Sequence, residues 1–171
     1  MVRRLSLLLS LVFLVSLSAH AQSSDDKYEL FGGYSYVRLD SSPATNMNGW
    51  NFSGQYKVTD WLGGVADLSG NYRFSSSDTT SASLYSFLVG PQITRTRGRF
   101  SPFAHVLFGF AHFGGGGVTS SSFSVALGAG VDAKITHSLS WRVIQADYLR
   151  TGFVGLSQSN VRASTGIVFR F

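Results

Sequence analysis

Three histidines follow residue 21 of the sequence, and they are its candidates for acid–base chemistry near neutral pH. His105 is expected to face the interior beside Gly109, as a hydrogen-bonded structural residue rather than a catalytic one. His112 is expected on the outer surface. Ser120 to Ser122 could supply a nucleophile there, but they are too loosely placed to predict a hydrolase. His137 falls in a turn and is expected to be solvated.

A second set of residues carries charge, with acids and bases in nearly equal number. Its expected members are Glu29, Asp67, Asp132 and Asp147, with Lys57, Arg73, Lys134, Arg162 and Arg170. They share one face of the predicted strands and are expected inside, where ion pairs would offset the cost of burying charge. The expected pairs are Asp147 with Arg73 or Arg162, and Glu29 or Asp132 with Lys57, Lys134 or Arg170. Two interpretations stay open: the pairs plug and stiffen the fold, or they form a gate for ions.

No motif predicts a cofactor, a metal site or a catalytic set. The chain has no cysteine, which excludes disulfides and thiolate ligands, and no cluster has the spacing of metal ligands. The run Gly114 to Gly117 lacks the lysine and the following helix of a phosphate-binding loop, and it predicts a flexible external loop. The sequence therefore predicts a protein that is not an enzyme and needs no cofactor.

Composition narrows the class of protein further. Only 13% of the 171 residues are charged, about half of the roughly 25% usual in soluble domains. Residues 1–21 are typical of a secretory signal peptide, with Arg3 and Arg4, an apolar run from Leu5 to Leu17, and a small-x-small site at Ala19 to Ala21. Cleavage of this segment would remove Arg3 and Arg4 and lower the formal net charge of +5 by two. Because no basic cluster stands out in the rest of the chain, no nucleic-acid partner is expected.

The remainder of the chain has no sustained helical periodicity and is predicted to form eight strands. The stretch Asn48 to Val58 is the clearest, because Trp50, Phe52, Tyr56 and Val58 alternate with polar residues. The expected strands are 28–39, 48–58, 61–74, 83–94, 100–113, 123–135, 139–149 and 161–171.

The connections between these strands alternate in length. Short ones are expected at Thr59–Asp60, Arg95–Arg99 and Thr136–Ser138, and longer polar ones at Asp40–Met47, Ser75–Ala82, Gly114–Ser122 and Arg150–Asn160. Short turns at one end and long loops at the other are typical of an outer-membrane barrel.

The two faces of the strands differ in size, and this difference predicts which face is inside. One face carries the aromatic side chains, and the other carries glycine, serine and alanine with the charges above. An eight-stranded barrel is only just wide enough for its inward side chains, so the small face is expected inside and the aromatic face in lipid. Arg38 and Arg142 are expected on the lipid face near strand ends. The alternation phase of the seventh strand stays open, since a bulge within the stretch Arg142 to Tyr148 would shift it.

The outward aromatic residues sort into two levels, as the girdles of a spanning barrel do. One level is expected near the long loops, at Tyr36, Trp50, Tyr72, Tyr85, Phe110 and Tyr148. The other is expected near the short turns, at Tyr28, Tyr56, Trp61, Phe100, Phe169 and Phe171. In the last eight residues, Gly166, Phe169 and Phe171 look like the C-terminal signal that the barrel assembly machinery recognises.

Four stretches, Phe31–Tyr36, Pro102–Gly109, Leu127–Asp132 and Ser164–Phe171, resemble the small outer-membrane β-barrel family of OmpA or OmpX type. The resemblance implies an all-β fold, an eight-stranded antiparallel up-and-down transmembrane barrel, with both termini in the periplasm and four loops outside the cell. It also implies insertion by the barrel assembly machinery with periplasmic chaperones. The expected domains are a signal peptide at 1–21, a short periplasmic segment at 22–27 and the barrel at 28–171. Because the chain ends at the eighth strand, a peptidoglycan anchor is not carried over.

The leading interpretation is a structural or surface-interaction protein of the bacterial outer membrane, with a lumen filled by small polar and ion-paired side chains. The alternative is a narrow channel for small ions or solutes. A third class is a lipid-modifying barrel enzyme that uses His112, and a soluble lipocalin-like carrier is the rival fold. Membrane lipids and lipopolysaccharide are expected partners. The sequence does not identify a ligand for the external loops.

Overall fold

The computed structural model describes residues 27–39, 45–73, 82–115, 118–153 and 156–171. The predicted signal peptide at 1–21 and most of the short segment after it lie outside the described residues. None of the described residues forms a helix that is long and apolar enough to cross a membrane.

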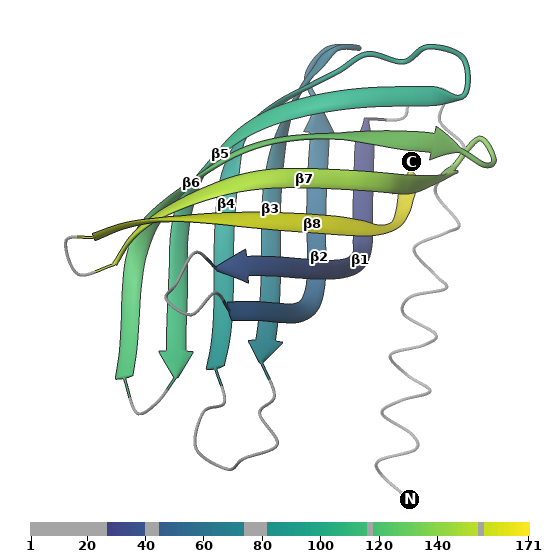
Figure 1. Cartoon of the computed structure of the whole chain (residues 1–171). Helices are drawn as coiled ribbons and strands as arrows, with labels where there is room; N and C mark the ends of the chain where they lie inside the picture. The colour runs from purple at the N-terminus through teal and green to yellow at the C-terminus, as the bar shows by residue number, and fades with distance from the viewer. Residues whose placement is uncertain (1–26, 40–44, 74–81, 116–117, 154–155) are drawn as a thin grey trace, which may run out of the picture.

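Eight strands account for nearly all of the described chain. They are β1 (Tyr28–Leu39), β2 (Thr45–Lys57), β3 (Leu62–Arg73), β4 (Ala82–Thr94), β5 (Phe100–Gly115), β6 (Val118–Lys134), β7 (Leu139–Phe153) and β8 (Leu156–Arg170). Each strand pairs antiparallel with the next along the chain, and β1 pairs with β8, so the sheet closes into a barrel (Figure 1). The predicted fold class is confirmed.

The strands are staggered around the barrel. Cross-strand partners followed once around from Glu29 on β1, through Val65 and Ala126, return to β1 at Leu39. One circuit of cross-strand partners is therefore displaced along β1 from Glu29 to Leu39, which is nearly the full length of that strand. A displacement of this size requires strands that are steeply tilted to the barrel axis.

The predicted faces are confirmed along most of the wall. Most aromatic side chains project outward, as the half-exposed Trp50, Phe87 and Tyr148 illustrate, whereas Ser35, Ser69 and other small residues are buried inside. In the level expected near the long loops, neighbouring strands share a polar contact: Tyr72 on β3 donates its hydroxyl hydrogen to Tyr85 on β4 at 3.0 Å.

One feature of the wall differs from the sequence-based expectations, and a second settles a point that they left open. The strands β5 to β8 extend further than predicted, so most of the expected loops Gly114–Ser122 and Arg150–Asn160 is paired strand. Serine and glycine lower strand propensity, but they do not stop the cross-strand ladder from continuing. The register of β7 shifts between Arg142 and Gln145, which confirms the possibility of a bulge there.

The short turns are built as expected. Between β4 and β5 the chain reverses at Gly98 and Arg99, and Gly98 has a φ of 59°. A two-residue hairpin needs a positive φ at its first central position, which glycine adopts without steric cost. The side-chain hydroxyl of Thr59 accepts a hydrogen bond from the Leu62 N–H at 3.0 Å in the turn before β3.

The seam between β1 and β8 depends on two facing glycines, Gly33 and Gly166. A Cβ atom at residue 166 would lie 2.3 Å from the carbonyl oxygen of Gly32. The two backbones therefore approach more closely at the point of closure than any side chain would allow.

We expect Gly166→Ala to lower the free energy of unfolding by about 1–3 kcal/mol, because the added methyl group would meet backbone that cannot move aside. Urea titration of the protein refolded in lipid vesicles, read by the gel mobility of unboiled samples, measures the change. Gly64→Ala is the matched control, since nothing lies within 4 Å of its Cβ position. Equal stability of the two variants would contradict this account of the seam.

Candidate functional site

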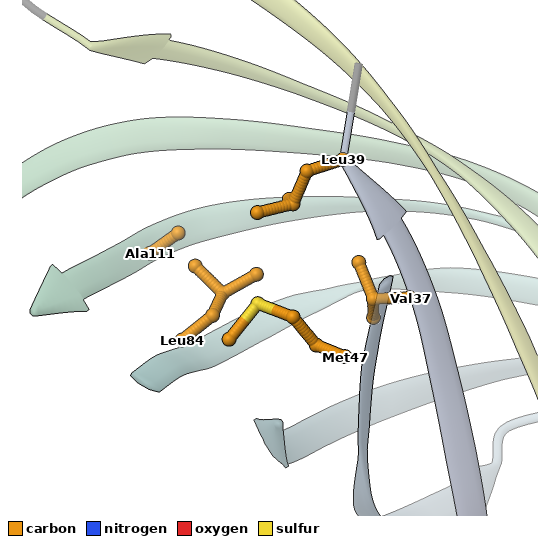
Figure 2. Packing of buried hydrophobic residues seen from close by; sticks show 5 residues of the cluster. All are labelled: Val37, Leu39, Met47, Leu84 and Ala111. Carbon is orange, nitrogen blue, oxygen red and sulfur yellow. The ribbon is translucent and has the colours of Figure 1, made fainter. Parts of the chain in front are cut away.

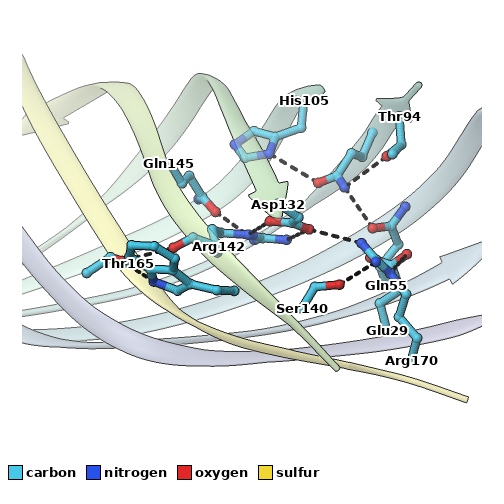
Figure 3. Close-up of polar contacts among 12 residues, drawn as sticks. Glu29, Gln55, Thr94, His105, Asp132, Ser140, Arg142, Gln145, Thr165 and Arg170 are labelled. Carbon is cyan, nitrogen blue, oxygen red and sulfur yellow. Dashed lines mark hydrogen bonds and ion pairs between the residues drawn. The ribbon is translucent and has the colours of Figure 1, made fainter. Parts of the chain in front are cut away.

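The interior of the barrel holds a continuous network of ion pairs and hydrogen bonds. Near the short-turn end, Glu29 contacts Lys57 at 2.6 Å and Arg170 at 2.9 Å. Arg170 also lies 3.3 Å from Asp132, which forms a second ion pair, at 2.8 Å, with Arg142 (Figure 3). These contacts join β1, β2, β6, β7 and β8 across the lumen at one level.

The network continues deeper into the barrel through an amide. Gln145 accepts a hydrogen bond from Arg142 at 2.8 Å and donates one to Asp147 at 2.9 Å. Asp147 pairs with Arg162 at 2.8 Å, and Arg162 reaches Asp67 at 2.7 Å. Since Arg162 is on β8 and Asp67 is on β3, this ion pair crosses between strands that are not neighbours in the sheet.

Arg142 is held by aromatic rings as well as by charge. Its guanidinium carbon lies 4.4 Å from the ring centroid of Phe31 and 4.3 Å from that of Phe103. Both rings are buried inside the barrel. Cation–π contacts gain strength when the cation is removed from water, so the two rings and Asp132 fix this side chain together.

Three expectations for the charged residues are corrected. Arg142 was expected on the lipid face, but the bulge sends Val143 and Ile144 outward together and leaves Arg142 buried. Arg73 and Lys134 were expected inside, but both are exposed, since each is the last residue of its strand. With Arg142 in their place, the paired interior charges are Glu29, Asp67, Asp132 and Asp147 against Lys57, Arg142, Arg162 and Arg170.

The three histidines lie in different surroundings. His105 is buried, with Nε2 2.8 Å from Asp147 and Nδ1 3.4 Å from Gln92, so it is part of the interior network as expected. His137 is exposed in the turn before β7. His112 was expected to lack a well-placed serine, but the extension of β6 places Ser121 directly opposite, with its Oγ 2.8 Å from Nδ1.

The contact of His112 with Ser121 is not a complete catalytic set. Among the described residues, no carboxylate lies within ion-pair distance of His112, so no third group orients the ring. No group of three or more histidine, aspartate or glutamate residues in the described part of the chain could hold a metal ion.

An apolar cluster occupies the end of the lumen away from the short turns. Val37 and Leu39 on β1 pack against Met47, Leu84 and Ala111 (Figure 2). The partly buried Phe113 packs against this cluster. In a closed barrel of eight strands, β1 and β5 lie on opposite sides. The contact of Val37 and Leu39 with this cluster therefore bridges the whole interior.

Between the apolar cluster and the ion pairs lies a group of polar atoms with no hydrogen-bond partner among the described residues. They belong to the side chains of Ser35, Asn51, Asn71, Ser124, Arg162 and Ser164. All six side chains are buried. Arg162 and Asn51 also contact the ion pairs, in which every carboxylate has a cation, so the unpartnered atoms border the network directly.

Sequence reasoning missed Arg142, the two rings around it and the apolar cluster. Alternation within β1 and β5 places Phe31 and Phe103 on the small face, which was the available signal for the rings. The predicted assembly residues are placed as follows: Phe169 and Phe171 are outward and exposed, and Gly166 faces inward at the seam. Their recognition by an assembly machinery stays a prediction.

Comparison with known proteins adds a family and several related folds. Residues 7–171 match a family model described as the outer membrane protein beta-barrel domain. The structure is similar to the crystal structure of Neisserial surface protein A, with a TM-score of 0.73 and 17% identity over 85% of this chain and 97% of that one. No curated protein sequence is significantly similar to this chain.

Two further solved structures share the fold. One is Ail, the attachment invasion locus protein of Yersinia pestis, with a TM-score of 0.55 and 20% identity over 83% of this chain and 97% of that one. The other is the outer membrane protein OprG from Pseudomonas aeruginosa, with a TM-score of 0.54 and 10% identity over 84% of this chain and 95% of that one. At these identities the likeness shows the fold alone.

We expect Arg162→Met to lower the free energy of unfolding by about 3–5 kcal/mol, because it leaves Asp67 and Asp147 buried without their guanidinium partner. Urea titration in lipid vesicles measures the loss. Lys134→Gln removes an exposed cation of the same barrel and is expected to change stability by less than about 0.5 kcal/mol. A loss for Arg162→Met no larger than that of the control would show that the network is not structural.

Proposed function

The chain belongs to the outer membrane protein beta-barrel domain family, and from this premise we propose that it is a non-catalytic outer-membrane protein with a sealed lumen and a structural or surface-interaction role. The family is the small outer-membrane barrel family that the sequence resemblance implied. The barrel is the rigid scaffold in this proposal, and interactions belong to the end opposite the short turns.

The filled interior is the observation that carries the proposal. The largest fully buried side chains include Arg162, Phe31, Met47, Leu88 and Leu107, all of which point into the lumen. Ion pairs occupy one end and the apolar cluster occupies the other. An ion that entered would have to displace paired charges and then cross a dry, apolar level, and both steps are costly.

The extended hairpins of β5–β6 and β7–β8 support a role at the cell surface. Their strands run beyond the aromatic level marked by Phe110 and Tyr148, and so they carry paired backbone past the apolar band. Ail, which shares the fold, is described as an attachment invasion locus protein. We propose contact with an external surface for this chain, with lipopolysaccharide as the lipid around its outer end, and insertion by the barrel assembly machinery after periplasmic chaperones.

A narrow channel is the second candidate function. It is favoured by the level of buried serine and asparagine residues whose side chains carry polar atoms with no partner among the described residues, since such atoms would suit a hydrated path. The apolar cluster lies between that level and the outer end of the barrel, and this arrangement ranks the channel second.

We expect the refolded protein to show no steady conductance steps in a planar lipid bilayer, because the lumen is closed at two levels. A shift in gel mobility between unheated and boiled samples would first establish that the sample is folded. The double variant Met47→Ala with Leu84→Ala shortens the apolar cluster and serves as the comparison. Steady steps from the unaltered protein would favour the channel instead.

The proposed orientation places the short turns in the periplasm and the β5–β6 end outside the cell. Because the chain has no cysteine, single cysteines can report it. A membrane-impermeant maleimide is expected to label Thr119→Cys on intact cells and to leave Asp60→Cys unlabelled until the outer membrane is opened. Both positions are exposed in the structure, so the reverse pattern would overturn the orientation.

A further inference from the structure

We propose that the barrel rim at the short turns carries a binding site for one anionic phospholipid. The site combines an apolar groove on the outer wall with the arginine-rich turn between β4 and β5. It rests on the membrane location proposed above, and it assigns a ligand class to a surface distinct from the lumen.

The groove has a volume of about 550 Å³ and opens on the lipid-facing side of β4 and β5. Its walls are Trp61, Ile93, Pro102 and Ala104, and Arg95 lies at its edge. Trp61 and Ile93 are 59% and 51% exposed, so apolar surface is open to the surroundings at this depth. A hydrocarbon chain is the apolar partner that a membrane supplies to such a surface.

The turn next to the groove concentrates positive charge. Arg95, Arg97 and Arg99 are all exposed within a single hairpin. The hairpin is held by backbone hydrogen bonds, from the Arg95 N–H to the Pro102 carbonyl at 2.9 Å and from the Arg97 N–H to the Phe100 carbonyl at 2.8 Å. The backbone N–H of Lys134 donates to the Arg99 carbonyl at 2.7 Å, which places a fourth cation beside the turn.

These four cations differ from those of the lumen in having no counter-charge. Within the described part of the chain, no ion pair joins Arg95, Arg97, Arg99 or Lys134 to a carboxylate. The adjacent turn carries Asp60, which forms no ion pair with them. Guanidinium groups bind phosphate oxygens in a bidentate manner, so the cluster suits an anionic phosphate.

The position of the site relative to the membrane surface favours a lipid headgroup as the source of that phosphate. Trp61 and Phe100 belong to the aromatic level at the short-turn end, and such residues lie at the height of lipid headgroups. The apolar walls extend from this level toward the middle of the barrel, along β4 and β5. A molecule that has a phosphate at one end and an acyl chain at the other matches both parts at once.

A second groove on the same wall provides an internal comparison. It has a volume of about 560 Å³ and is lined by Tyr28, Leu30, Gly54, Gly64 and other residues of β1 to β4, together with Phe171. Its lining contains Glu29 and no cation. We therefore expect acyl chains to contact this groove without preference for an anionic headgroup.

The test is native mass spectrometry of the refolded full barrel in detergent micelles with added phosphatidylglycerol or phosphatidylcholine of identical acyl chains. The unaltered protein is expected to retain phosphatidylglycerol in preference. Arg95→Gln is expected to reduce that retention about fivefold, and the triple change of Arg95, Arg97 and Arg99 to Gln is expected to abolish the preference. Ala104→Leu, which fills the groove, is expected to lower retention of both lipids.

Two variants serve as controls. Arg38→Gln removes an exposed cation at the opposite end of the barrel, and Gly64→Leu fills the second groove. Both are expected to keep the preference, and an unboiled gel sample establishes the folding of every variant. Equal retention of the two lipids by the unaltered protein, or no effect of Arg95→Gln, would overturn the proposal.

Competitors separate the possible sources of phosphate. If inorganic phosphate displaces the bound anion and Ala104→Leu has no effect, the turn is a simple anion site and the phospholipid assignment is wrong. Retention of lipopolysaccharide in place of phosphatidylglycerol would overturn it as well. These results concern the purified barrel, so they are independent of the cysteine labelling and conductance measurements that test the proposed function.

Discussion

The narrow interior of an eight-stranded barrel is the constraint on which the rest of this structure depends. Closure of β1 on β8 pairs the last free sheet edge, and a lipid-facing wall needs this because hydrocarbon cannot satisfy backbone groups. Closure also leaves a lumen that side chains fill, so its inward residues are either uncharged or matched in charge. The facing glycines of the seam and the paired charges of the lumen both follow from it.

The interior is packed by charged side chains at one end and by aliphatic side chains at the other. Charged side chains form a network from the short-turn end to the middle, and each carboxylate contacts at least one cation. Aliphatic side chains close the other end, where β1 meets residues from the opposite side of the barrel. Together these side chains make the lumen a packed core.

The strands, their faces and the girdles could be predicted because alternation with period two is a local property of the sequence. The site could be predicted only in part. One extra residue after Arg142 reverses the face of that arginine, and no local signal separates Arg142 from a residue at an ordinary strand end. Alternation placed Arg73 and Lys134 on the inward face, but each is the last residue of its strand and is exposed at the end of the barrel. The pairing of Arg162 with Asp67 depends on which strands face each other across the lumen, which alternation does not encode.

The last strand supplies the cations for most of the interior carboxylates. Arg162 and Arg170 on β8 reach Asp67, Asp147, Glu29 and Asp132, which lie on β3, β7, β1 and β6. A sheet of the first seven strands would face the bilayer with acidic groups that lack these partners. Glu29 and Asp132 also pair with Lys57 and Arg142, whereas the printed ion pair of Asp67 is with Arg162 on β8, so ring closure brings that buried carboxylate its guanidinium partner. The joining of β8 to β1 therefore completes the ion pairs of the interior as well as the backbone ladder of the sheet.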